Sequence, residues 1–299
     1  AGPYNAIASG SESIAIGYQA AASANRSMAL GRATVAGSNY SVAIGHSSGG
    51  SGAQAGTGAG AMALGGSFAT GTDSFAAAIA NNTSTYGATG ANSVAMGDRV
   101  KATGNYSTSL GRLNNVSGPN GASAIGQSLT VSGEGAFSAG STNFASGAYS
   151  QALGYGANTA SIYGKFAKAN GFFSNYADAQ LGMFILRSDT TDATPEVVTT
   201  NKTAGSATNQ VILPNNSAYA FSGTIVARQQ ASQGTASAAW KIEGLIRREG
   251  SAGTTVLVNS ATTVLDNTPS WGMALSADTT NGGLKIQATG AASTNIRWV

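Results

Sequence analysis

The chain has 299 residues, 42 of them glycine, and only 9% of its residues are charged. Its net charge of +3 comes from 15 basic and 12 acidic residues, with no basic run longer than Arg247-Arg248, so no nucleic-acid-binding surface is expected. The sequence contains no cysteine, which excludes disulfides, thiolate metal sites and cysteine nucleophiles. No run of 18 apolar residues occurs, so we expect no membrane insertion.

A five-residue pattern recurs through the first half of the chain. Ser13–Gly17, Ser27–Gly31 and Ser41–Gly45 all read small polar, apolar, Ala, apolar, Gly, and they lie 14 residues apart. Two longer intervals hold insertions, over residues 46–60 and 81–92. A fixed period with insertions at one phase is typical of a solenoid. The copies of the pattern close at Gly17, Gly31, Gly45, Gly65, Ala80, Gly97, Gly111, Gly126, Gly140 and Gly154.

Each repeat alternates in the manner of a β-strand rather than a helix. Ile14 and Ile16 fall on one side, while Ser13 and Ala15 fall on the other. A second, weaker alternation follows each glycine, as in residues 100–102, and small residues then close the unit. We therefore expect a 14-residue coil of two short strands joined by tight turns, in which glycine supplies the backbone freedom.

So thin a coil has room only for alanine and serine, which places the large aliphatic residues outside. They would form a long apolar stripe, a feature that soluble monomers avoid. A rod with one such stripe closes most simply around a rotation axis, so we expect a parallel homo-oligomer. If the large residues filled the coil instead, this argument would weaken. The expected oligomer core comprises Ile14, Ile16, Leu30, Ile44, Leu64, Met96, Leu110, Ile125 and Leu153.

The pentapeptide [Ser/Asn]-x-Ala-[Ile/Leu]-Gly at 14-residue spacing resembles the YadA-like head repeat of trimeric adhesins, over roughly residues 11–165. The same repeat is found in phage tail fibres and related fibre-tip proteins. The resemblance implies a left-handed parallel β-roll of three chains around one axis. Ala61 and Ala136 in place of serine, and Ala80 in place of glycine, depart from the pattern.

The register fails near residue 160, and the composition changes. We expect the β-roll over residues 1–160, then an aromatic-rich neck over 161–181 whose rings cap the last coil, with a ligand platform as the alternative. Residues 182–299 contain about nine short alternating runs separated by Asn, Gly, Pro and Ser. This pattern predicts an antiparallel β-sandwich or jelly roll, similar in general character to phage fibre tips.

No residue constellation suggests catalysis, so we expect neither an enzyme nor a cofactor. The single histidine, His46, is a weak candidate for a metal or anion site on a trimer axis, although a plain loop position is the favoured interpretation. Recognition usually lies on loops, and exposed aromatic and arginine residues dominate many interfaces. The favoured interpretation of Trp240, Trp271 and Trp298 is that each packs in the core of the C-terminal module. The receptor-binding candidates are Asn215, Asn216, Tyr219, Arg248 and Trp271 in the tip and Tyr86 in the second insertion.

These features together suggest an extracellular homotrimeric attachment protein whose rod projects a receptor-binding tip. A phage tail fibre on a virion is the first hypothesis. The alternatives are a bacterial surface adhesin or fibre-tip protein, and a purely structural fibre segment. The expected partners are two further copies of the chain, a host surface glycan or outer-membrane protein, and upstream fibre or baseplate proteins, without nucleic acid or membrane insertion.

Overall fold

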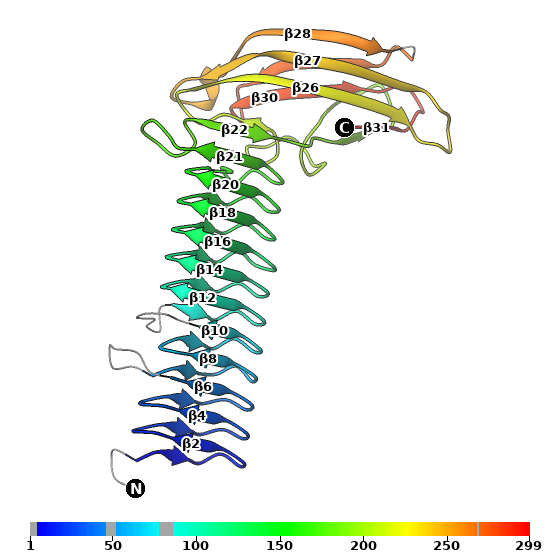
Figure 1. Cartoon of the computed structure of the whole chain (residues 1–299). Helices are drawn as coiled ribbons and strands as arrows, with labels where there is room; N and C mark the ends of the chain where they lie inside the picture. Colours follow the sequence, from blue (N-terminus) through cyan, green and yellow to red (C-terminus); the bar gives the residue numbers. More distant parts are fainter. Residues whose placement is uncertain (1–4, 46–51, 78–85, 268) are drawn as a thin grey trace. The chain divides into compact units, whose positions relative to one another are not determined.

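The structure is a computed structural model that describes residues 5–45, 52–77, 86–267 and 269–299. The chain divides into two units, each of which is built from β-strands (Figure 1). The solenoid unit comprises Ala1–Ser161 and Phe166–Leu181, and the C-terminal unit comprises Ile162–Lys165 and Gly182–Val299. The described residues contain a single short helical turn, the 3-10 segment Ala252–Thr254.

The coils of the solenoid unit stack into two sheets, here called the short-strand and long-strand sheets. The short-strand sheet contains β1(Ile7–Ala8), β3(Ala21–Ala22), β5(Val35–Ala36), β7(Gln54–Ala55), β9(Phe68–Ala69), β11(Gly87–Ala88), β13(Lys101–Ala102), β15(Asn115–Val116), β17(Thr130–Val131) and β19(Phe144–Ala145). The long-strand sheet contains β2(Ile14–Ile16), β4(Met28–Leu30), β6(Val42–Ile44), β8(Met62–Leu64), β10(Phe75–Ala77), β12(Val94–Asp98), β14(Thr108–Arg112), β16(Ser123–Gln127), β18(Phe137–Ser141), β20(Gln151–Tyr155), β21(Phe166–Asn170) and β22(Gln180–Met183).

Successive coils pair in parallel with equivalent positions aligned. In the long-strand sheet, Ala29 pairs with Ala43 of the next coil. Further along, Ser109 pairs with Ala124, and Ala124 pairs in turn with Ser138. Because every coil repeats the same register, side chains of the same position form continuous ladders along the stack.

One detail of the predicted register is wrong. The fifth copy was expected to close at Ala80, yet Ala76 pairs with both Ala63 and Ala95, so the repeat lies two residues earlier. The run of alanines at 76–78 offers several positions that fit the pattern, and pairing of inward alanines selects one of them. Consequently Gly87 and Ala88, expected in an insertion, form strand β11 of the regular stack. Ala80 itself lies outside the described residues.

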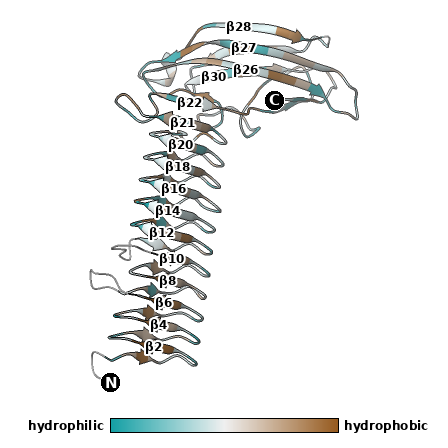
Figure 2. Ribbon diagram, viewed as in Figure 1, coloured by the Kyte–Doolittle hydropathy of each residue, from teal (hydrophilic) through white to brown (hydrophobic). Residues whose placement is uncertain are grey.

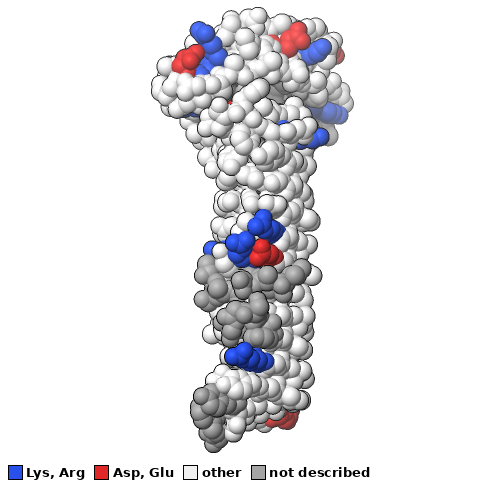
Figure 3. Space-filling view, turned by 60° about the vertical axis from the view of Figure 1, so that its left-hand side comes forward, with Lys and Arg blue, Asp and Glu red and all other residues white. Residues whose placement is uncertain are grey.

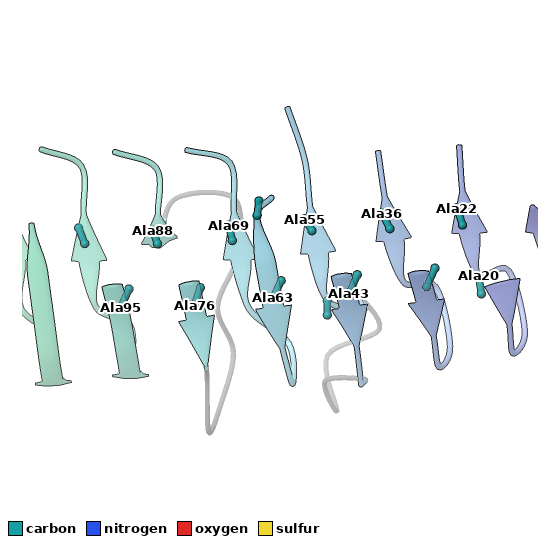
Figure 4. Packing of buried hydrophobic residues seen from close by; sticks show 14 of the residues in the cluster. Ala20, Ala22, Ala36, Ala43, Ala55, Ala63, Ala69, Ala76, Ala88 and Ala95 are labelled. Carbon is teal, nitrogen blue, oxygen red and sulfur yellow. The ribbon is translucent and has the colours of Figure 1, made fainter. Parts of the chain in front are cut away.

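Small side chains fill the coils. Alanines from the two sheets face each other across the interior, as Figure 4 shows for Ala36 and Ala43 among others, and both are fully buried. Serine takes the inward position in two coils, at Ser109 and Ser138. The large aliphatic residues of the pentapeptides face outward as expected, whereas Val116, Leu129 and Val131 are fully buried inside later coils.

The glycine that closes each pentapeptide is required by its neighbour in the next coil. At Gly111 the backbone has φ of 122°, in the region that L-residues avoid. A Cβ atom there would lie 2.0 Å from the carbonyl oxygen of Gly126 in the next coil. Both the turn and the close stacking therefore exclude a side chain at this position.

The segment that follows the last pentapeptide continues the solenoid. Strand β21 pairs in parallel with β20, so Phe166 lies beside Gln151 and Ala167 beside Ala152. This segment had been expected to form a neck over residues 161–181, and β21 shows that the parallel stacking extends into it.

Aromatic rings gather at this end of the solenoid unit. The Phe172 ring contacts Tyr155 at 5.5 Å and Tyr176 at 4.8 Å, and Tyr176 contacts Phe144 at 5.1 Å between centroids. The carboxylate of Asp178 accepts hydrogen bonds from three successive backbone N–H groups, beginning at Phe173, and these bonds hold its pKa below the usual value. The rings thus pack on one another beside a fixed turn.

The C-terminal unit contains two antiparallel sheets around one core. The first sheet has the order β23(Ser188–Thr190), β31(Ile296–Trp298), β26(Ser217–Gln229), β27(Ser237–Arg248) and β28(Val256–Asp266). The second has the order β24(Pro195–Val197), β30(Gly283–Thr289) and β25(Val211–Ile212), with β29(Gly272–Asp278) also paired to β30. The predicted fold class, a β-solenoid followed by antiparallel sheets, is confirmed.

Three tryptophans anchor the core between the two sheets. Trp240 stacks on Trp298 at 5.7 Å, and Trp271 contacts Trp298 at 6.0 Å, with all three at most 5% exposed. The indole N–H of Trp298 donates to Thr190 Oγ1 at 2.9 Å, so its one polar atom is satisfied. Leu284 and Ile286 contribute from the second sheet.

Enlarging one alanine inside the coil tests how tightly the solenoid is packed. We expect Ala124→Leu to lower the free energy of unfolding by about 1–3 kcal/mol, because Ala124 is fully buried and a larger side chain would overpack the coil. Asn115→Leu is the control, since Asn115 is exposed on the short-strand sheet, away from the coil interior. Urea unfolding followed by circular dichroism measures both. Equal stability of the two variants would show that the interior has spare room.

Candidate functional site

An apolar ladder runs along the outer face of the long-strand sheet. It is formed by the third residue of each strand, and the strand pairing places its members directly above one another. In the single chain Ile16 is 64% exposed, Ile125 50% and Met96 44%. This aliphatic ladder consists of Ile16, Leu30, Ile44, Leu64, Ala77, Met96, Leu110, Ile125, Ala139 and Leu153.

A second ladder lies two residues before the first and changes character along the stack. Its first six members are apolar, and the later ones include Thr108, Ser123 and Gln151. Figure 2 shows the hydrophobic strands β2, β4 and β6 in brown. The sequence-based list contained only Ile14 of this ladder. The members that it missed occupy the position directly after the small residue that opens each repeat: Met28, Val42, Met62, Phe75 and Val94.

Charged groups are sparse on the solenoid face that Figure 3 shows. Some of them form ion pairs between or within turns: Arg26 contacts Glu12 at 2.7 Å, and Asp98 lies 3.3 Å from both Arg99 and Arg112. The hydrogen bond from Arg99 is the main cause that lowers the pKa of Asp98. Such exposed pairs are screened by water and contribute little to stability. The described residues of the solenoid unit thus present an apolar surface rather than a charged one.

Three of the predicted receptor-binding residues meet at one end of the C-terminal unit. Asn215 and Asn216 are exposed in the loop before β26, and the N–H of Asn216 donates to the carbonyl oxygen of Glu249 at 3.1 Å. Arg248 is half-buried, and its Nη1 donates to the carbonyl oxygen of Leu213 at 2.8 Å. Arg248 therefore holds this loop in place, while the two asparagines remain accessible.

The predicted aromatic contacts lie elsewhere. Trp271 is 5% exposed and lies in the core. The Asn267 side chain closes the turn before Trp271: its Oδ1 accepts a hydrogen bond from the Trp271 N–H at 2.9 Å, and its Nδ2 donates to the Trp271 carbonyl oxygen at 2.8 Å. Tyr219 is half-buried against the same core. Tyr86 belongs to the solenoid unit, where the ammonium of Lys101 lies 5.4 Å from its ring. His46 lies outside the described residues.

Strand β28 is an edge strand that neither sheet covers. Only Leu257 of its eleven residues is half-buried, and the rest are exposed. Val258 is 48%, Val264 57% and Leu265 59% exposed. Asp266, at the end of the strand, is its one charged residue. A long apolar edge of this kind is prone to pair with another chain unless something covers it.

Nothing in the described part of the chain has the geometry of a metal centre. No group of three or more His, Cys, Asp or Glu residues lies close enough together to hold an ion there. Among these residues there is also no helix with the length and apolarity needed to cross a membrane.

The sequence was compared with known proteins. The model of the YadA head domain repeat matches residues 4–20, 8–34, 22–48 and 88–114. No curated protein matches the chain. The described residues of these ranges fall within the coils of the solenoid unit, so the repeat and the 14-residue period describe the same structural element there.

Lys165 is an unusual buried cation in the C-terminal unit. It is 1% exposed, and its Nζ lies 5.7 Å from the centre of the Phe184 ring. Removal from water disfavours the charged ammonium and lowers the pKa of Lys165 to about 8. The residue therefore links the folding of this unit to pH.

We expect stability to rise with pH because of Lys165. The unfolded chain restores its ordinary pKa of 10.5, so between about pH 8 and 10.5 the unfolded chain holds a proton that the folded chain lacks. The free energy of unfolding should increase across this window by up to about 3 kcal/mol, and Lys165→Met should abolish the increase. Urea unfolding followed by tryptophan fluorescence reports on this unit, since it holds all three tryptophans. If the unaltered protein and the Lys165→Met variant showed the same pH dependence of the free energy of unfolding, Lys165 would not be its cause.

Proposed function

We propose that the chain is a homotrimeric attachment protein. The premise is that it carries YadA-like head repeats and is therefore an adhesin-like fibre. The solenoid unit joins three copies of the chain. The C-terminal unit provides the surface that contacts a host cell. The protein acts outside the cell that produces it.

The exposed aliphatic ladder supports self-association most directly. Its members are aligned from β2 to β20, so a copy of the same chain offers a surface of matching length and spacing. Fully burying one aliphatic side chain contributes about 1.5–3 kcal/mol, and many are buried at once when the ladders meet. Copies related by a rotation axis cover every ladder without leaving an open end. Ile14 and its five apolar neighbours widen this surface over the first coils.

Attachment by three weak sites explains why no single strong site is needed. Once one C-terminal unit of a trimer contacts a surface, the other two bind at high effective concentration. The loops at the end marked by Asn215, Asn216 and Arg248 are the proposed contact region, because loops on a rigid scaffold tolerate the variation that recognition requires.

A phage tail fibre is the specific identity that we favour. In an autotransporter adhesin we would expect a coiled-coil stalk after the head, whereas here residues 182–299 form antiparallel sheets. A host glycan or outer-membrane protein is the proposed receptor, and fibre or baseplate proteins are the proposed upstream partners. A bacterial surface adhesin is the second candidate, and the YadA head match is the observation that favours it.

The trimer is tested by mass. Light scattering of the full chain at micromolar concentration should give three times the chain mass of 29.4 kDa. Leu110→Glu combined with Ile125→Glu should reduce the mass to that of one chain, because the charges would be buried in the apolar interface. Asn115→Glu is the control, since Asn115 is exposed on the other sheet. A single-chain mass for the unaltered protein contradicts the proposal.

Attachment is tested with fluorescently labelled full-length protein on whole cells. Binding to bacterial cells is expected for a phage fibre, binding to animal cells would favour the adhesin, and binding to neither would indicate a structural segment. Asn215→Ala together with Asn216→Gly should weaken binding at least several-fold, and glycine suits the φ of 57° at Asn216. Asn259→Ala on β28 is the matched control and should bind normally.

A further inference from the structure

A pocket of about 380 Å³ opens between two edge strands of the C-terminal unit. Ser188 and Asp189 of β23 form one wall, and Pro195 to Val197 of β24 form another. Strand β23 is the outer strand of the first sheet and β24 that of the second, so the pocket lies where the edges of the two sheets meet. None of the predicted receptor-binding residues lines it. Its volume is within the range of about 300–1,000 Å³ that is usual for small-ligand sites.

The third wall is a loop that the protein holds in a fixed shape. The Oδ1 atom of Asn201 accepts hydrogen bonds from the Thr203 hydroxyl at 2.8 Å and from the amide of Asn209 at 2.9 Å. Asn209 is 1% exposed and also donates to the carbonyl oxygen of Ala204 at 2.9 Å. Between these anchors Lys202 adopts a φ of 63°, which is unusual for a residue other than glycine. A strained backbone held by surrounding bonds is common at binding sites.

The charged groups of the pocket face solvent and are partly held in place. The Lys202 ammonium forms an ion pair with Asp189, and their side chains remain 49% and 31% exposed. Glu196 is exposed on β24, and among the described residues its carboxylate has no hydrogen-bond or ion-pair partner. Two carboxylates and one ammonium give the pocket a formal charge of −1.

These groups restrict the chemistry of a ligand. The negative charge disfavours phosphates and acidic sugars. No aromatic side chain lines the pocket, so a nucleobase or other flat ring has nothing to stack on. The remaining surface offers acceptors at Asp189 and Glu196, donors at Lys202, and hydroxyls at Ser188 and Thr203 that do both. Sugar hydroxyls can both donate and accept, and they match this set.

We propose that this pocket binds a neutral sugar unit of a surface glycan, with Glu196 accepting hydrogen bonds from its hydroxyls. The ion pair with Asp189 orients Lys202 as a donor, and the Pro195 ring offers an apolar surface for the sugar C–H groups. This inference rests on the proposed attachment function and names the class of receptor that one pocket of the C-terminal unit recognises.

Saturation-transfer NMR on the full-length protein tests the proposal. The probes are the methyl glycosides of glucose, galactose, mannose and N-acetylglucosamine, with sialic acid as the acidic comparison. We expect at least one neutral sugar to bind, and Glu196→Gln to weaken that binding roughly tenfold or more, because a carboxylate is a stronger acceptor than an amide. Glu243→Gln, on the exposed face of β27, is the matched control and should leave binding unchanged. Tryptophan fluorescence verifies that each variant is folded.

Three results would overturn the proposal: no signal from any neutral sugar, unchanged binding by the folded Glu196→Gln variant, or stronger binding of sialic acid. The mass and cell-binding measurements test the proposed attachment function independently of the pocket. A trimer that attaches to cells but fails these sugar tests refutes the pocket and leaves the attachment function standing. A single-chain protein whose sugar binding depends on Glu196 supports the pocket and refutes the trimer.

Discussion

The narrow interior of the coil is the constraint from which the rest of the solenoid follows. Two strands of two to five residues lie so close that alanine or serine fills the space between them, as Ala36 and Ala43 do. The larger side chains of the pentapeptide then point outward, and only a few coils admit a larger residue inside, such as Val116 and Val131. Because parallel stacking repeats the register, those side chains form ladders rather than scattered contacts. The apolar surface that favours association is thus a direct result of a core too thin to hold it.

The same constraint explains the composition. A coil that is stabilised mainly by backbone hydrogen bonds and close stacking needs few large apolar residues. It needs glycine where the backbones of successive coils come close together, as at Gly111 beside Gly126. The interior of the coil offers no place for a charged side chain, and some of the charged residues present form ion pairs on the outside, such as Arg26 with Glu12. The C-terminal unit follows the opposite rule. It buries Trp240, Trp271 and Trp298 in one conventional core between two sheets.

The solenoid could be predicted from sequence because its order is local and repeated. The alternation of Ile14, Ala15 and Ile16 predicts which face of the strand is buried. The 14-residue period predicts which residues of successive coils lie beside each other. The prediction failed in detail at residues 76–80, where several alanines suit the pattern and only pairing with Ala63 and Ala95 decides. In the C-terminal unit, composition predicted strands but not their neighbours. The sequence favoured a core position for Trp271 over a receptor-binding one, and its packing against Trp298 of β31 confirms the core position.

The sugar pocket shows why candidate sites are harder to predict than repeats. Asp189, Glu196 and Lys202 lie within 14 residues of one another in the sequence, and nothing in their spacing resembles a motif. They converge because β23 pairs with β31 in one sheet while β24 pairs with β30 in the other. Both partner strands come from the last part of the chain, so the pocket exists only after the sandwich has closed. A binding surface that depends on long-range pairing can change through its loops while the repeats, which depend on local pairing, stay the same.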